Sequence, residues 1–309
     1  MQIKLNQLDS KRIEQLHDTM EINRVVAQLL NDFVANHSTY VTLPALNQLR
    51  EEYGMSSEMA FAMLMSAACG LDTAQNQIHK QLFNDYFLPS VRSLSPKDYA
   101  DDIYLKTIHL TPKTVGNISL AIKKYQPCEA FVIDDAVLSS DFREFPQIGF
   151  FTTEYEYPVL TISETESISL TPKYIDSAMP YIEDVRGYVL VHGLGLGYFP
   201  FMASQKKSVK KITVVEPNTE LTEFFTTEIL PQFTNKEKVE ITTAAPADTY
   251  DYTFTDPWQK SRLSHLRTQK FNTLYTIFKQ QSVVSSNEND ITSYNEFIKL
   301  LSDNELVKQ

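Results

Sequence analysis

The chain has 309 residues, of which 42% are hydrophobic and 22% are charged. This composition is ordinary for a globular protein and excludes wholesale disorder, and the length favours two domains over one. The formal net charge is −11 and no basic stripe is present, which argues against binding to the phosphate backbone of a nucleic acid as the main function.

The positions of the cysteine, histidine and apolar residues argue against several further classes of protein. Cys69 and Cys128 lie far apart and outside any C-x-x-C, which argues against a disulfide framework or a cysteine zinc site and predicts a cytoplasmic location. The six histidines form no H-x-H or H-E-x-x-H, so no metal site is predicted. No signal peptide is expected, and the most apolar stretch, 59–69, is too short to span a bilayer, so no membrane partner is predicted.

Residues 1–103 are predicted to form an α-helical domain, because apolar residues recur there at helical spacing. Five helices are expected: 9–34, 42–53, one that Ser56 or Ser57 caps and Gly70 ends, 72–87, and one that begins at Ser95 and Pro96. Gly54 and Pro89 mark the predicted ends of the second and fourth.

Residues 104–180 are predicted to form a small β-rich connector. Aromatic and β-branched residues stand between turn formers at 130–133, 149–153 and 159–163, which is typical of strands. Thr171 and Pro172 then predict the start of a helix that runs to about residue 182.

Residues 181–309 are predicted to be an α/β domain. Strands are expected at 188–191, 211–215, 239–242 and 252–255, with helices at 198–205 and 219–230. Such alternation predicts crossover connections and a parallel sheet. Two further helices, 262–281 and 291–301, are expected to finish the chain.

Glycine is concentrated in one short segment of this α/β domain. The chain has only eight glycines, and Gly193, Gly195 and Gly197 fall within five residues, between the first strand and the first helix of the α/β domain. A glycine turn there lets the backbone approach a ligand, and the helix N-terminus offers N–H groups to an anion. The alternative is a tight turn that packs helix on sheet; ligand binding is the interpretation favoured here.

Glu216 ends the next predicted strand, 19 residues after Gly197. An acidic residue at about this interval accepts ribose hydroxyls in nucleotide-binding folds, and a carboxylate can accept two such protons. Alone, Glu216 would be a surface residue; together with the glycines it is predicted to be a ribose ligand.

The pattern G-x-G-x-G followed by an acid at the end of the second strand resembles the class I S-adenosylmethionine-dependent methyltransferases. Apolar Val191, two positions before Gly193, and the segment 250–258 with Asp256 look closer to the spermidine-synthase-like branch of that family. The resemblance covers about 150–260. It implies a Rossmann-like parallel sheet, truncated after the fourth strand or completed by a short strand near 283–285, and S-adenosylmethionine as the cofactor.

The resemblance also implies site residues. Cofactor contacts are expected from His192, Gly193, Leu194, Gly195, Gly197, Tyr198, Glu216, Pro217, Ala245 and Asp256. Ala244 and Ala245 stand where the family usually has an acid that holds adenine, so adenine is expected to be held by backbone or by Asp248. Asp256 is the predicted catalytic residue, a proton acceptor for an amine or hydroxyl; a helix cap before Pro257 is the alternative.

The first functional hypothesis is therefore a methyltransferase of unknown acceptor, a small molecule rather than a protein, with the helical domain supplying acceptor specificity. Residues 1–180 carry a net charge of −9 against −2 for 181–309, which favours a cationic or neutral acceptor. Two alternatives stay open: a non-catalytic protein that binds the cofactor or a nucleotide, and an aminopropyltransferase, which Pro257 and Trp258 disfavour. The apolar N-terminal helices are a candidate surface for a homodimer.

Overall fold

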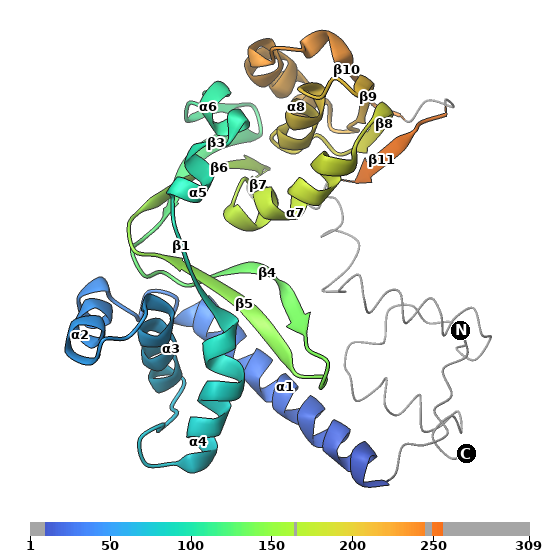
Figure 1. Cartoon of the computed structure of the whole chain (residues 1–309). Helices are drawn as coiled ribbons and strands as arrows, with labels where there is room; N and C mark the ends of the chain where they lie inside the picture. The colour runs from blue at the N-terminus through green and yellow to red at the C-terminus, as the bar shows by residue number, and fades with distance from the viewer. Residues whose placement is uncertain (1–9, 164–165, 245–248, 256–309) are drawn as a thin grey trace. The chain divides into compact units, whose positions relative to one another are not determined.

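The computed structural model describes residues 10–163, 166–244 and 249–255 (Figure 1). These residues form two compact units, each built from separated stretches of chain. The first unit contains residues 10–92 and 130–149, and the second contains 93–129 and 150–255. The helices expected at 262–281 and 291–301, and the strand expected near 283–285, lie outside the described residues.

The first three predicted helices are confirmed. They are α1 (Ser10–Asn36), α2 (Leu43–Tyr53) and α3 (Ser57–Ala68). The side chains of Thr42 and Ser56 accept backbone N–H groups at the starts of α2 and α3, and Gly54, with φ 64°, ends α2. Short polar residues and a left-handed glycine thus set these boundaries, as the sequence pattern indicates.

The fourth helix begins later than the predicted residue 72. Asp72 Oδ1 accepts the N–H groups of Ala74 and Gln75, at 3.1 and 2.9 Å, which forms a local turn that competes with helix. Asn76 then caps α4 (Gln77–Leu82). The helix continues as a π-helical turn, η1 (Phe83–Phe87), and ends in a 3₁₀ turn, η2 (Leu88–Ser90), which contains Pro89.

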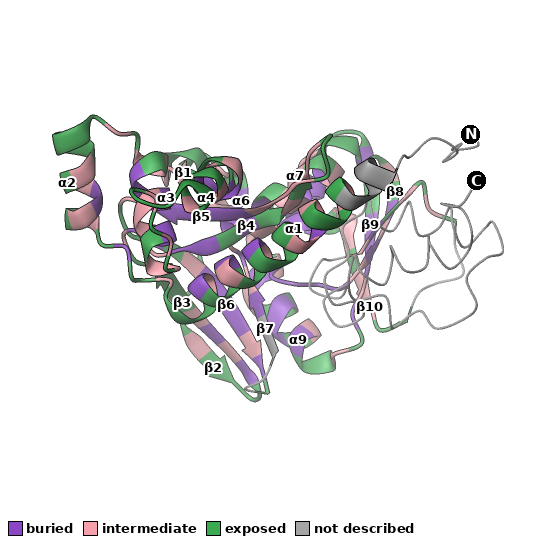
Figure 2. Ribbon diagram, turned by 90° about the horizontal axis from the view of Figure 1, so that it is seen from below, coloured by how far each residue is buried: buried purple, intermediate pink, exposed green. Residues whose placement is uncertain are grey.

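The first unit also contains strands. β4 (Phe131–Leu138) and β5 (Glu144–Phe151) pair antiparallel, and β1 (Val91–Leu94), which was not predicted, lies beside β5. In Figure 2 buried residues run along the strands, whereas α1 and α2 also carry exposed faces. The core of the unit takes side chains from both kinds of element: Val26, Leu30, Phe33, Phe61, Phe131 and Ile148.

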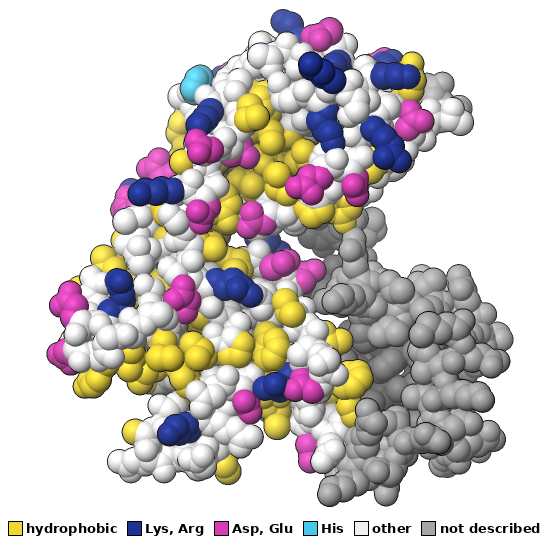
Figure 3. Space-filling model, in the orientation of Figure 1, with side chains coloured by type: hydrophobic (Ala, Val, Ile, Leu, Met, Phe, Trp, Pro, Cys, Tyr) yellow, Lys and Arg dark blue, Asp and Glu magenta, His cyan; other side chains and the backbone are white. Residues whose placement is uncertain are grey.

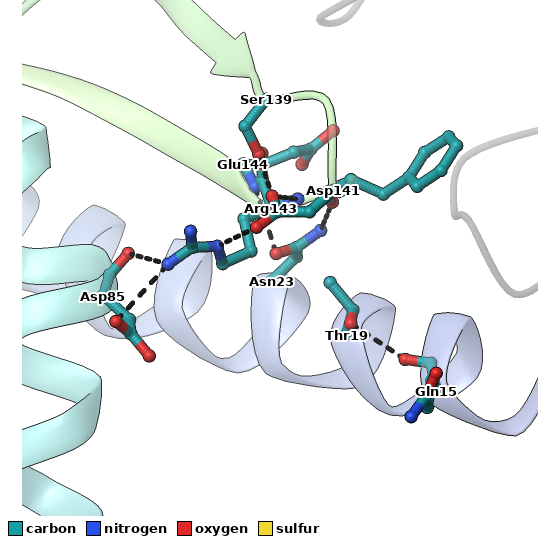
Figure 4. A network of polar contacts seen from close by, with 9 residues as sticks. Gln15, Thr19, Asn23, Asp85, Ser139, Asp141, Arg143 and Glu144 are labelled. Carbon is teal, nitrogen blue, oxygen red and sulfur yellow. Dashed lines mark hydrogen bonds and ion pairs between the residues drawn. The ribbon is translucent and has the colours of Figure 1, made fainter. Parts of the chain in front are cut away.

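The tip of the β4–β5 hairpin is attached to α1 by polar contacts (Figure 4). Asn23, 3% exposed, donates from Nδ2 to the carbonyl oxygen of Phe142 at 2.8 Å and accepts the N–H of Glu144 at 3.1 Å. Arg143 pairs with Asp141 at 2.8 Å in the same turn and with Asp85 of η1 at 3.4 Å. Two helical segments therefore fix the position of one hairpin.

The second unit begins with two short helices in place of the predicted fifth helix, α5 (Lys97–Ala100) and α6 (Ile103–Thr107). Asp102 caps α6 by accepting the N–H of Leu105 at 3.0 Å. An antiparallel sheet follows, in the order β2 (Lys113–Val115), β3 (Ile118–Tyr125), β6 (Tyr155–Ile162) and β7 (Glu166–Ser169). The strand-rich character predicted for this stretch is confirmed, with boundaries shifted by a few residues.

A second sheet in this unit is entirely parallel. After α7 (Pro172–Asp184), the chain forms β8 (Gly187–His192), α8 (Tyr198–Ser204), β9 (Val209–Val215) and α9 (Thr219–Phe224). The turns η3 (Phe225–Ile229), η4 (Leu230–Gln232) and η5 (Lys236–Lys238) lead to β10 (Val239–Thr242), and β11 (Tyr252–Thr255) is the last described strand. The sheet order is β10-β9-β8-β11, so the predicted mixed α/β architecture with a parallel sheet is confirmed.

The surface of the described residues carries charges of both signs. On the face that Figure 3 shows, lysine and arginine side chains are interspersed with aspartate and glutamate. None of the helices in the described part of the chain has the length and apolar character needed to cross a membrane.

Candidate functional site

The carboxyl ends of the four parallel strands meet at one edge of their sheet. From β8 the chain passes to β9 on one side, whereas β11 lies on the other side, so the direction of the strand order reverses between β8 and β11. Ligands of open α/β sheets bind outside the carboxyl ends of strands at such a reversal. His192 ends β8 there and is in register with Val215 and Thr255.

The glycine turn, residues 193–197, follows β8 at this edge. Gly193, Gly195 and Gly197 have φ values of 89°, 56° and 79°, a region that costs other residues about 1–2 kcal/mol. A Cβ atom on Gly197 would lie 2.3 Å from Cε2 of Phe225 in η3. Backbone conformation therefore requires all three glycines, and Gly197 is also required for packing, as the alternative interpretation of the turn expects.

Hydrogen bonds account for only some of the N–H groups of the turn. Gly193 donates to the carbonyl of Val215 at 3.0 Å, and Gly197 donates to that of Leu194 at 2.9 Å. The N–H groups of Gly195 and Leu196, both buried residues, have no partner among the described residues. Buried N–H groups almost always have a partner, and alternating positive and negative φ values are typical of anion-binding turns. The turn therefore offers two donors to a ligand.

Glu216 lies against the glycine turn. Its carboxylate accepts the N–H of Leu194 at 3.1 Å and the N–H of Asn218 at 2.9 Å, and the residue is 4% exposed. The contact with Leu194 connects the end of β9 to the turn after β8, and the contact with Asn218 lies within the loop after β9, so Glu216 has a structural role. Each carboxylate oxygen has a further lone pair, so the group can still accept a hydroxyl.

Tyr198, a predicted cofactor contact, is buried at the start of α8. Its hydroxyl donates to Asp102 Oδ2 at 2.7 Å, and the hydroxyl of Tyr104 donates to the carbonyl of Leu196 in the glycine turn. The rings of Tyr104 and Tyr198 pack edge to face at 5.4 Å. Burial, together with the charge of Asp102, raises the pKa of both phenols, so both remain neutral donors.

The structure describes only some of the other predicted site residues. Leu194 is buried within the glycine turn and Pro217 is exposed after β9. Ala245 and Asp256 lie outside the described residues, as do Asp248 and Trp258. The predicted roles of Ala245, Asp248 and Asp256 stay predictions.

Sequence reasoning missed Asp102 and Tyr104, which support the glycine turn from α6. Tyr104 stands 92 residues before Leu196 and Asp102 stands 96 residues before Tyr198, and the only signal in the sequence is a total of 16 tyrosines. Among the described residues, no group of three His, Cys, Asp or Glu side chains is arranged to hold a metal ion.

No protein-family model, no curated protein and no solved structure matches this chain.

Proposed function

We propose that this protein is an S-adenosylmethionine-dependent methyltransferase with a Rossmann-like sheet of the class I type, acting on a small-molecule acceptor. The observation that carries the proposal is the contact between Glu216 and the N–H of Leu194, at 3.1 Å. The glycine turn and the acidic residue, 22 positions apart in sequence, meet at one edge of a parallel sheet. Two buried N–H donors, which have no partner within the described ranges, therefore lie in a turn that Glu216 contacts.

The donors and acceptors at this edge match the groups of the proposed cofactor. The N–H groups of Gly195 and Leu196 suit a carboxylate, and the free lone pairs of Glu216 suit ribose hydroxyls. The cofactor supplies a methyl group on a sulfonium, and its transfer depends mainly on positioning and on exclusion of water. The protein residues would then orient the two reactants, with Asp256 as the proposed proton acceptor.

Ligand binding by the full-length chain tests this proposal. We expect S-adenosylmethionine and S-adenosylhomocysteine to bind in calorimetry and to raise the melting temperature, because both carry the carboxylate and the ribose. NAD should not bind, since its fingerprint requires a third glycine at a position that Tyr198 occupies. Binding of NAD alone, or of none of these ligands, would contradict the proposal.

A non-catalytic cofactor-binding protein is the second candidate. Two observations favour it: Ala244 stands where an acid is expected, and both carboxylate oxygens of Glu216 already accept backbone N–H groups. Assays with S-adenosylmethionine labelled in its methyl group, across amine and hydroxyl acceptors, separate the candidates. Binding without transfer to any acceptor supports the second candidate, and decarboxylated S-adenosylmethionine in the same assay tests aminopropyl transfer.

A further inference from the structure

Helix α1 carries a second apolar row besides the face that is buried in the first unit. Ile22 and Val25 are 38% and 45% exposed, and half-buried Leu29 continues the row toward the end of the helix. Residues three and four positions apart lie along one side of an α-helix, so these three side chains are neighbours. We call this row the α1 stripe. Contiguous exposed apolar side chains, unlike single ones, mark a surface that another segment covers.

Acidic residues stand at both ends of the α1 stripe. Asp18 lies one turn before the stripe and Asp32 lies one turn after it, and both are exposed. Glu21, which borders the stripe, pairs with Arg24 at 3.0 Å. The α1 stripe therefore favours a partner that is apolar at its centre and carries positive charge beside the apolar residues.

These charges argue against a second copy of α1 as the partner. In a parallel pair of α1 helices each acid would meet its own copy, and in an antiparallel pair Asp18 would lie near Asp32 of the other copy. Like charges that face each other across an interface are unfavourable in both arrangements. The α1 stripe thus suits a basic partner better than the homodimer contact expected from the sequence.

The chain itself contains a segment of the required kind, after β11 and outside the described residues. Phe271, Leu274 and Phe278 repeat the spacing of the α1 stripe, and Arg267 precedes them by one helical turn. A basic sequence with this spacing is typical of an amphipathic helix that binds an apolar surface. Residues 257–287 include no aspartate or glutamate and contain the cations Lys260, Arg262, Arg267, Lys270 and Lys279.

We propose that residues 262–281 pack as a helix along the α1 stripe of the same chain. Leu274 and Val25 are the middle members of their rows, so they meet at the centre of the contact whichever way the helix runs. The contact covers the exposed apolar side chains of α1 and brings cations to the acids at the ends of the stripe. It involves neither the glycine turn nor a cofactor, so the inference goes beyond the proposed function.

Disulfide trapping in the full-length chain tests the proposal. The double variant Val25→Cys with Leu274→Cys should form an intramolecular disulfide under mild oxidation, because the contact brings the two Cβ atoms within the short distance that a disulfide requires. Mass spectrometry identifies the cysteines that are joined. Asn31→Cys with Leu274→Cys is the matched control, since Asn31 is exposed on another side of α1, and it should give a several-fold lower yield.

Charge variants of the same double-cysteine chain test why the segment binds there. Arg267→Glu should lower the yield of the disulfide several-fold, and high salt should lower it as well, because exposed charges are screened. Lys308→Glu is the control, since Lys308 lies outside 257–287, and it should leave the yield unchanged. Adding Asp18→Lys to Arg267→Glu should restore the yield if the helix runs parallel to α1, and adding Asp32→Lys should restore it if the helix runs antiparallel.

Three results would overturn the inference. The first is an equal yield from the Val25 and Asn31 pairs. The second is a yield that Arg267→Glu leaves unchanged, or lowers in a way that neither lysine variant restores. The third is a disulfide between two chains in the single variant Val25→Cys, which would show that a second copy covers the α1 stripe. Since no measurement involves S-adenosylmethionine, each of these results leaves the proposed function untouched.

Discussion

Single residues of the glycine turn are constrained by backbone conformation and by packing at once. Gly197 combines a φ of 79° with a ring of Phe225 where a Cβ atom would stand. Glu216 combines burial with two hydrogen bonds to backbone N–H groups. Substitutions at these two positions therefore separate the structural role of the turn from its proposed role in binding.

Gly197→Ala should destabilise the second unit more than Gly116→Ala. Both glycines have positive φ, 79° and 57°, so each substitution costs about 1–2 kcal/mol of conformational strain. Only at Gly197 does the added Cβ meet Phe225 at 2.3 Å, whereas its nearest neighbour at Gly116 is 3.7 Å away. Urea unfolding measures the difference, for which we expect a further 1–3 kcal/mol, roughly the usual loss on overpacking. Equal losses would mean that Phe225 moves aside freely.

Glu216→Ala should weaken binding of S-adenosylmethionine by about 1.5–3 kcal/mol, because a charge-assisted hydrogen bond to the ribose is lost. It should also lower the free energy of unfolding, since the N–H groups of Leu194 and Asn218 lose their acceptor. Calorimetry and chemical denaturation measure the two effects separately, with exposed Glu220→Ala as the control. Unchanged affinity in a destabilised Glu216→Ala variant would leave Glu216 with a structural role only.

At the scale of elements, the first unit depends on contacts between segments far apart in the chain. Asn23 of α1 takes both a donor and an acceptor role toward the turn of the β4–β5 hairpin, more than 110 residues later. Arg143 of the same turn reaches Asp85 in η1. These contacts fix a hairpin whose own pairing is interrupted by register shifts between Val132 and Val137.

Asn23→Ala should therefore destabilise the first unit by about 2 kcal/mol, because two part-buried backbone groups, the carbonyl of Phe142 and the N–H of Glu144, lose their partners. Asn36→Ala on the same helix is the control, since Asn36 is exposed and bonds only to Asp32 among the described residues. Measuring the free energy of unfolding of both variants tests this prediction. A loss at Asn23 no larger than that at Asn36 would show that the hairpin is held by its apolar contacts alone.

At the scale of the whole molecule, neither unit is a continuous stretch of chain. Residues 130–149 complete the first unit with β4 and most of β5, and residues 93–129 begin the second. The N-terminal helices share their core with Phe131 and Ile148 of that later segment. Folding of the first unit thus requires closure of a long loop between the helices and their sheet.

A fragment of residues 1–103 should fail to fold on its own, because it lacks the strands that bury the apolar face of α1. We expect helical circular dichroism without a cooperative melt and with poorly dispersed amide signals in NMR. A fragment of residues 1–150 contains the missing strands and is the matched comparison. Cooperative unfolding of the shorter fragment would show that the helices form an independent core.

The stability of the second unit should fall as the pH rises above about 10, the usual pKa of tyrosine. Burial raises the pKa of Tyr99, Tyr104, Tyr155 and Tyr198 in the folded chain. Above this pH the unfolded chain releases phenolic protons that the folded chain retains, so the unfolded state binds fewer protons and ΔG of unfolding decreases with pH. Urea unfolding at pH 9, 10 and 11, with tyrosinate absorbance as the second signal, measures this slope. Titration of all tyrosines near pH 10 in the folded protein would contradict it.

Local sequence signals predicted most of the elements. Caps at Thr42, Ser56 and Thr171, the glycine at 54 and the alternation after residue 187 gave helices and parallel strands at the observed positions. These signals act within a few residues, so an isolated sequence contains them completely. They failed where a local turn competes with helix, as at Asp72, because the pattern of apolar residues does not register that competition.

The sequence by itself determined the glycine turn and its acidic neighbour, because left-handed backbone admits few residues other than glycine and because the spacing of Glu216 follows from one βαβ unit. Tertiary structure alone decided that Asp102 and Tyr104 gather beside that turn, and that residues 130–149 belong with the N-terminal helices. These groupings arise because folding brings together side chains that lie 92 and 96 residues from their partners in sequence, and contacts at that separation leave no local pattern of residues.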